Sequence, residues 1–251
     1  MLVLLPPSEG KAPAPRRGKP LDLAALSWPE LTAARAQVLD GLEQLAHGDP
    51  VQARAALGIS ERMDAELERD RRLRTSPTLT AAALYTGVLY DALDLARLDP
   101  GARRWATRNV AIVSALFGVL RLGDRVPIYR LSACTRVPGI GPLVPFWRQQ
   151  LDAVLAPAAG RDLIVDLRST DYAVMWRPRG ELAARTVAVH VRRDGVVASH
   201  DAKHTRGLVV RRLCEAGERL RRPEQLVDVL APSFDTRLEP SGASWRLEVL
   251  L

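Results

Sequence analysis

Short apolar runs that end at prolines or polar clusters dominate the hydrophobic pattern of this chain. Residues 1–5 are entirely apolar and stop at Pro6-Pro7, and residues 110–115 and 162–167 form two similar runs. Runs of this length, without polar alternation, are typical of strands that are buried on both faces of a parallel sheet. We therefore predict three core strands at these positions.

Turn residues separate four more predicted strands in the C-terminal part of the chain. These strands are expected over residues 185–191, 195–199, 234–238 and 244–250. Asp194-Gly195 would form the turn of the first pair. The segment Pro240-Ser241-Gly242 would form the turn of the second pair, a closing hairpin.

Apolar residues recur at helical spacing through much of the remaining chain. From Pro29 to Ala46 they return every three or four positions, as on the buried face of a helix. Asp49-Pro50 offers a capping carboxylate followed by a proline suited to the first helical position. Helices are predicted over residues 29–46, 50–57, 60–74, 78–96, 100–107, 142–155, 202–222 and 223–230. The charge run from Glu66 to Arg74 is expected to be solvated.

Strands alternate with helices along the chain, without a repeat, a low-complexity segment or a clear linker. This order predicts one mixed α/β domain over residues 1–251, with a central sheet of buried strands flanked by helices and a C-terminal β-hairpin. The chain has 251 residues, of which 47% are hydrophobic and 26% charged. That composition excludes disordered, collagen-like and disulfide-framework proteins.

Nothing in the sequence predicts a membrane or an export signal. No run of about 18 apolar residues is present, and the N-terminus lacks the basic start of a signal peptide. The two cysteines, Cys134 and Cys214, suit a reducing compartment better than a disulfide scaffold. We expect a cytoplasmic protein without a membrane partner; the oligomeric state is left open.

The net charge predicts an anionic partner. Lysine and arginine total 36 against 29 acidic residues, a formal charge of +7. Nucleic acid or a phosphorylated small molecule would suit this balance, and a basic surface without function is the alternative. Only three of the 36 cations are lysines, namely Lys11, Lys19 and Lys203. Lysine, unlike arginine, is a compact charge whose pKa shifts readily.

Five polar clusters lie where predicted strands end or helices begin, which is where α/β proteins place ligand sites. The first, Pro6 to Lys11, would bind phosphate through Lys11 and main-chain N–H groups, although its glycine spacing is not that of a Walker A loop. The second, Tyr85-Thr86-Gly87, lies inside the predicted 78–96 helix. Its glycine would permit close packing or ligand approach; for both clusters a purely structural role is the alternative.

The third and fourth clusters follow the two core strands that end near residues 115 and 167. In the third, Arg121 and Arg130 would form a bidentate anion clamp beside Tyr129, or Arg121 would instead pair with Asp124. The fourth spans residues 166–172. There Ser169 and Tyr172 would face the ligand, or Ser169 and its neighbour would only cap a helical turn.

The fifth cluster, residues 199–207, is the most site-like. Lys203 and Arg206 are three positions apart and share one face at a helix N-terminus, where an anion would stabilise both the cations and the helix dipole. His200 and His204 have the spacing of a metal pair, but no third ligand accompanies them. No metal and no cofactor are expected.

A glycine turn precedes the predicted 142–155 helix. Gly139 and Gly141 flank an isoleucine, as in the hairpin of helix-hairpin-helix modules, whose N–H groups bind DNA phosphates without reading sequence. An ordinary Gly/Pro turn is the alternative. The preceding residues look extended, so the first helix of such a module is not evident.

The five clusters, in this order, resemble the successive motifs of the YaaA peroxide stress proteins over residues 1 to about 212. The resemblance implies a cytoplasmic bacterial protein that supports peroxide tolerance by limiting free iron and oxidative DNA damage. It also implies a single α/β fold with a positively charged cleft, a helix-hairpin-helix element and DNA binding of weak sequence preference. The cleft residues carried over are Lys11, Tyr85, Arg121, Tyr129, Arg130, Ser169, Tyr172, Lys203 and Arg206.

Two functions follow. One is binding of DNA duplexes or junctions, with arginines 211, 212, 219, 221 and 222 as further phosphate contacts. The other is an enzyme for a nucleotide or other anionic small molecule, in which Ser169, Tyr172 and Lys203 do the chemistry and a buried Lys203 acts as base or nucleophile. If the clusters meet in a deep pocket, the small-molecule enzyme is favoured. If they line an open groove, DNA binding is favoured.

Overall fold

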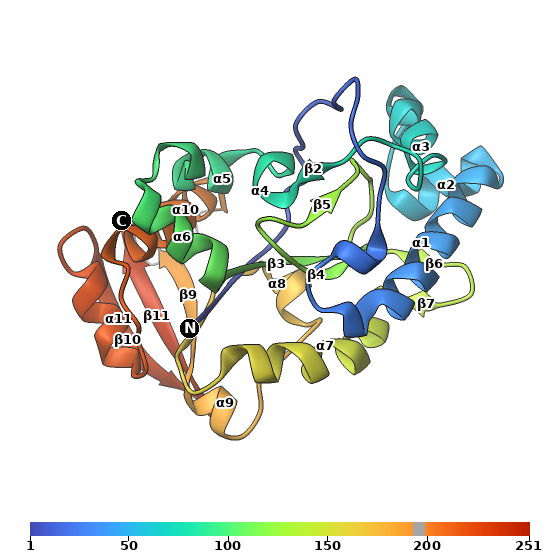
Figure 1. The fold of residues 1–251 in the computed structure, drawn as a ribbon. Helices are drawn as coiled ribbons and strands as arrows, with labels where there is room; N and C mark the ends of the chain where they lie inside the picture. The colour runs from blue at the N-terminus through green and yellow to red at the C-terminus, as the bar shows by residue number, and fades with distance from the viewer. Residues whose placement is uncertain (193–198) are drawn as a thin grey trace.

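A mixed sheet runs through the molecule in the strand order β10-β11-β9-β8-β1-β3-β4 (Figure 1). This computed structural model describes residues 1–192 and 199–251. The sheet strands are β1 Leu2–Leu5, β3 Val110–Ser114, β4 Gly118–Arg121, β8 Ile164–Asp166, β9 Thr186–Arg192, β10 Asp235–Ser241 and β11 Ser244–Leu250. Two small pairs accompany it, β2 Leu79–Thr80 with β5 Arg125–Val126, and β6 Arg136–Val137 with β7 Gly141–Pro142.

Strand β1 lies at the centre, parallel to β3 on one side and to β8 on the other. Every residue of β1 and β3 is buried, so the apolar runs are core strands as predicted. Strand β9 is parallel to β8, and β11 is parallel to β9. The carboxyl ends of these strands therefore meet at one edge of the sheet, and the α/β class with its C-terminal hairpin is confirmed.

Helices cover the sheet and extend beyond the β4 side (Figure 1). Their bounds are α1 Thr32–His47, α2 Pro50–Leu57, α3 Asp64–Asp70, α4 Ala81–Leu84, α5 Val88–Leu93, α6 Pro100–Asn109, α7 Leu143–Ala159, α8 Thr170–Ala173, α9 Glu181–Ala184, α10 Ser199–Ala216 and α11 Pro223–Leu230. Helix α10 packs on α5, α6 and β9. None of the helices in the described ranges is long and apolar enough to cross a membrane.

The prediction of one helix over residues 78–96 is wrong. The chain instead forms β2, α4 and α5, with an interruption at Tyr85-Thr86-Gly87. The cause is the N-terminal loop, which takes the main-chain groups that a helix would use. Lys11 forms a β-bridge with Tyr85, and the Thr86 N–H donates to the Gly10 carbonyl at 3.2 Å. Gly87 has a φ of 99°, so it begins α5 in a conformation that favours glycine.

The expected helix-hairpin-helix element is a β-hairpin followed by one helix. Gly139, in the turn between β6 and β7, and Gly141, the first residue of β7, have φ angles of 73° and 82°, and α7 follows directly. Residues 127–135 before the hairpin form no helix. Pro127 has no N–H to donate, and the Arg130 N–H is taken by a side chain of α3.

Shorter shifts in element bounds include α3, which ends at Asp70 and not at residue 74, and β10, which extends through Pro240 and Ser241 of the predicted turn. Further differences concern the segment around residue 200. The strand expected over 195–199 and the Asp194-Gly195 turn fall on residues 193–198, outside the described ranges. Ser199 is the first residue of α10, and this helix ends at Ala216 rather than near residue 222.

Gly207 sets how closely α10 approaches α5. A Cβ at this position would lie 2.2 Å from the Leu89 carbonyl oxygen and 2.7 Å from the Ala92 Cβ. The two helices therefore pack backbone against backbone, and this contact positions the face of α10 that carries Lys203 and Arg206.

We predict that Gly207→Ala destabilises the protein by about 1–3 kcal/mol, because neither the Leu89 carbonyl nor the α5 backbone can move freely away. At an unhindered glycine in a helix, the same substitution would instead stabilise the protein, since alanine is favoured over glycine in a helix interior by about 1 kcal/mol. Urea unfolding measures the difference. Gly123→Ala is the control, because its Cβ would meet no atom within 4 Å; equal effects of the two substitutions would contradict the packing argument.

Candidate active site

Two adjoining pockets open at the carboxyl edge of the sheet, one of about 100 Å³ and one of about 440 Å³. The smaller, which we call the lysine pocket, is lined by Lys11, Tyr129, Arg130, Ser132 and Cys134 among others. The larger, which we call the α10 pocket, is lined by Tyr90, Ser169, Lys203 and Arg206 among others. Pro7, Ser8, Glu9, Asp171 and Tyr172 line both. The loops that leave β1 and β8 thus form a shared wall.

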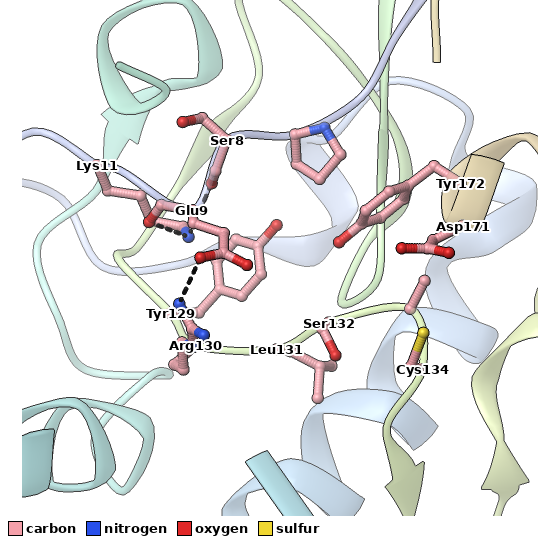
Figure 2. A pocket seen from close by; sticks show the side chains of 12 residues that line it. Ser8, Glu9, Lys11, Tyr129, Arg130, Leu131, Ser132, Cys134, Asp171 and Tyr172 are labelled. Carbon is pink, nitrogen blue, oxygen red and sulfur yellow. Dashed lines mark hydrogen bonds and ion pairs between the residues drawn. The ribbon is translucent and has the colours of Figure 1, made fainter. Parts of the chain in front are cut away.

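Lys11 extends into the lysine pocket from the loop after β1 (Figure 2). Its Nζ donates to the main-chain carbonyls of Ser8 at 3.2 Å and Glu9 at 3.4 Å, and it lies 4.7 Å from the centre of the Tyr129 ring. Burial, followed by the charge of Arg130, lowers the pKa of Lys11 to about 8. A substantial share of this amine is therefore neutral at mildly alkaline pH.

Asp70 lies behind Arg130 at the end of α3 and is fully buried. Its Oδ1 accepts from the Arg130 N–H at 2.9 Å, while its Oδ2 has no hydrogen-bond partner among the described residues. Burial raises the pKa of Asp70 to about 8. The prediction of a solvated charge run is therefore wrong at this position. Leu67 and Leu73, three residues to either side, are buried and mark the same face.

All four tyrosines of the chain gather at the pockets. The Tyr129 hydroxyl lies 2.8 Å from the Tyr85 hydroxyl and 2.8 Å from Ser114 Oγ, so three buried hydroxyls form one chain. Tyr90 donates to the Pro6 carbonyl at 2.7 Å. Burial raises the pKa of all four phenols. They are neutral hydrogen-bonding groups at physiological pH.

Tyr172 is the tyrosine that both pockets share. Figure 2 shows its hydroxyl pointing into the lysine pocket from the wall opposite Lys11. Ser169 precedes it at the start of α8 and lines the α10 pocket. The structure therefore brings these two predicted residues to the same site as Lys11.

Lys203 and Arg206 line the α10 pocket together, as their spacing predicts. Arg206 is half-buried, and its Nε is buried without a hydrogen-bond partner among the described residues. Burial lowers the pKa of this guanidinium, and Asp166 opposes the shift. Lys203 is exposed, so the burial expected of it is not observed. The buried lysine of the site is Lys11.

Three predicted site residues lie elsewhere. Arg121 lines neither pocket; its guanidinium lies 4.5 Å from the centre of the Trp28 ring and donates to the Arg108 carbonyl at 2.9 Å. The predicted clamp of Arg121 with Arg130 is therefore not formed, and Arg130 instead lies 3.7 Å from the Glu9 carboxylate. Gly139 and Gly141 also line neither pocket. Tyr85 lies behind the lysine pocket and contacts it through Tyr129.

Most of the arginines expected to extend a DNA surface from α10 are engaged within the protein. Arg211 pairs with Glu215 at 2.8 Å, and Arg212 donates to the Val229 carbonyl at 3.0 Å. Arg219 and Arg221 both lie near Asp162, at 2.8 and 3.7 Å. Where the chain is described, no group of three or more His, Cys, Asp and Glu residues could hold a metal ion. The side chain of His200 lies outside that description.

Several residues at the site were not selected from the sequence. Asp70, Ser132 and Cys134 lie outside the five motif clusters. Their positions follow from α3 and from the loop between β5 and β6, which fold against the sheet edge from distant parts of the chain.

Comparisons with known proteins agree over nearly the whole chain. A family model described as peroxide stress protein YaaA matches residues 1–237. A UPF0246 protein of Streptomyces coelicolor is 46% identical over 257 aligned positions, which cover 100% of this chain and 98% of the relative. A UPF0246 protein of Corynebacterium efficiens is 39% identical over 231 positions, 91% of each chain. An uncharacterised protein of Campylobacter jejuni is 27% identical over 212 positions, which cover 84% of this chain and 83% of the relative.

We predict that Asp70→Asn becomes more stable relative to wild type as the pH rises. The folded protein holds the Asp70 proton with a pKa of about 8 against 3.8 ordinarily, so wild type loses stability between those values. Asparagine does not titrate, and the difference is expected to grow by up to ~1.4 kcal/mol per pH unit. Urea unfolding from pH 5 to pH 8 measures it. Asp64→Asn, at a half-exposed position of the same helix, serves as control; a difference independent of pH would refute the assignment.

Proposed function

Because the chain belongs to the YaaA family of peroxide stress proteins, we propose that it acts in that response by binding a phosphorylated small molecule in the two adjoining pockets. Family membership supports the general role in peroxide stress. The observation that carries the ligand class is Arg206, whose Nε is buried in the pocket wall without a partner among the described residues. A buried donor of this kind costs free energy unless a ligand satisfies it.

The α10 pocket has the groups that a phosphate requires. Arg206 presents a planar fork of donors, Lys203 adds a point charge three residues earlier, and Ser169 at the start of α8 lines the same pocket. Asp166 is the carboxylate whose charge raises the pKa of Arg206. It already forms an ion pair with Arg168 at 2.7 Å. The α10 cations therefore remain available to an incoming anion.

The size of the site favours a small molecule over a duplex. The α10 pocket, at about 440 Å³, lies within the usual range for pockets that bind nucleotides and similar ligands, roughly 300–1,000 Å³. Contacts to a DNA backbone need exposed cations, whereas Lys11 and the tyrosines of this site are largely buried. We assign Ser169, Tyr172 and Lys203 to ligand contact, and a catalytic role for them remains a proposal.

A second candidate function, DNA binding, is favoured by a different surface. Helix α6 exposes Arg103, Arg104 and Arg108 around a surface hollow of about 500 Å³ that Pro100 and Thr107 complete. Exposed arginines on one helix face suit phosphate contacts of weak sequence preference. The family resemblance also implies protection against iron-dependent damage to DNA, and this role stays a prediction.

The ligand proposal predicts that Arg206→Gln weakens binding of phosphorylated compounds at least about tenfold, or ~1.4 kcal/mol. Titration calorimetry with inorganic phosphate, nucleoside mono- and diphosphates and ribose 5-phosphate measures the affinity. Arg237→Gln, which removes the same charge from an exposed position on β10, is the control. No binding of any of these compounds to wild type, or equal loss in both variants, would contradict the proposal.

The DNA candidate predicts a surface separate from the pockets. Binding to duplex and four-way-junction probes is expected to fall steeply with salt, and Arg104→Gln with Arg108→Gln should reduce the slope of log K against log salt by about 1.8, or 0.9 per phosphate contact. Arg206→Gln and Lys203→Ala are expected to leave that slope unchanged. If Lys203→Ala instead abolishes DNA binding, the pockets themselves form the DNA site. An absence of DNA binding at low salt would refute this candidate.

A further inference from the structure

We propose that Lys11 is a nucleophilic amine that forms an imine with the bound ligand, which narrows the ligand class to phosphorylated aldehydes and ketones. This inference rests on the proposed function, because the phosphate would lie at Lys203 and Arg206. The shared wall of the two pockets would then place the carbonyl end in the lysine pocket.

The hydrogen bonds of Lys11 leave its lone pair free. In the neutral amine, two N–H groups are available for the two main-chain carbonyls that Nζ contacts, those of Ser8 and Glu9. Both acceptors belong to the loop that carries Lys11, so they hold the amine in one orientation. The lone pair then points away from these carbonyls, and an electrophile in the pocket can approach it.

Lys11 forms no ion pair with a described carboxylate. The nearest acidic side chain of its own loop, Glu9, is 85% exposed and is directed to Arg130. Glu66 and Asp70 of α3 act to raise the pKa of Lys11, and Arg130 in the loop after β5 acts to lower it. Asp70 is itself largely protonated at neutral pH because of its burial, so it opposes Arg130 only weakly.

This environment is the one that activates lysine for imine chemistry. A lysine becomes nucleophilic when it is desolvated and lies beside another cation, because both effects favour the neutral amine. Lys11 satisfies both conditions through its burial and Arg130. Arginine could not replace it, since a guanidinium stays protonated. Lysine is otherwise rare in this chain, at 3 of 36 cations, and two of the three line these pockets.

The step is a condensation. The Nζ lone pair attacks the carbonyl carbon, the C=O π pair moves to oxygen, and one Nζ proton is transferred to that oxygen to give a neutral carbinolamine. The nitrogen lone pair then forms the C=N bond as the C–O bond breaks. The leaving hydroxyl takes up a second proton and departs as water, the remaining Nζ proton is released, and no oxidant or reductant is involved. The Tyr172 hydroxyl, neutral and directed into the pocket opposite Lys11, is placed to donate to the carbonyl oxygen (Figure 2).

Labelling with two reagents tests the proposal. The protein is incubated with pyridoxal 5′-phosphate, a phosphorylated aldehyde, or with pyridoxal, which lacks the phosphate. Borohydride then reduces any imine, and peptide mass spectrometry locates it. We expect labelling of Lys11 by pyridoxal 5′-phosphate to exceed that of exposed Lys19 at least tenfold at pH 7.5. Labelling of Lys11 should level off near pH 8, whereas that of Lys19 continues to rise.

The comparison of reagents and variants separates the two proposals. Lys11→Arg is expected to remove the label without affecting Lys19, and Arg206→Gln should abolish the preference for the phosphorylated reagent. If Lys11 reacts rapidly but equally with both reagents, the imine proposal stands and the phosphate site is refuted. If Lys11 reacts no faster than Lys19 in wild type, the imine proposal is overturned. That comparison is made within one folded protein and does not depend on the folding of a variant.

Discussion

The main-chain pairing of residues 10–12 with residues 84–86 holds both pockets in place. Lys11 bridges to Tyr85, Thr86 donates to Gly10, and Ala12 donates to the Leu84 carbonyl at 2.9 Å. The pairing interrupts the α4–α5 segment and ties the loop that leaves the central strand to it. Residues of that loop line both the lysine pocket and the α10 pocket, so the pairing fixes the side of the site that the two pockets have in common.

Burial of charge gives the site its chemical character. Lys11 and Arg206 lose solvation in a region where the tyrosines stay neutral and where Glu9 and Asp171 are the acidic residues that line both pockets. Burial also raises the pKa of Asp70 to about 8, which weakens the effect of this carboxyl on the pKa of Lys11 near neutral pH. The ligand that we propose for this peroxide stress protein, a small phosphorylated molecule, rests on this arrangement. The exposed arginines of α6 line neither pocket.

Several site residues could be predicted from the sequence and several could not. The order of motifs identified Lys11, Tyr129, Arg130, Ser169, Tyr172, Lys203 and Arg206, because each follows a buried strand or begins a helix whose position the apolar pattern marks. Arg121 carries the same local signal, yet it stacks on Trp28 far along the chain. Asp70 lies in a run of charged residues, a pattern typical of an exposed segment, although its own side chain is buried. Local patterns cannot tell these cases apart, because partners from distant segments decide them.

By itself the sequence determined the core strands, most helices and the closing hairpin. It also determined that polar side chains would gather at the carboxyl edge of the sheet. Unbroken apolar runs can satisfy their hydrogen bonds and bury both faces only inside a parallel sheet. The tertiary structure decided where the Tyr85-Thr86-Gly87 segment leaves the helix, which lysine is buried and which arginines remain available. These outcomes depend on main-chain groups and carboxylates that come from elsewhere in the chain, and burial shifts a pKa only once the whole environment has assembled.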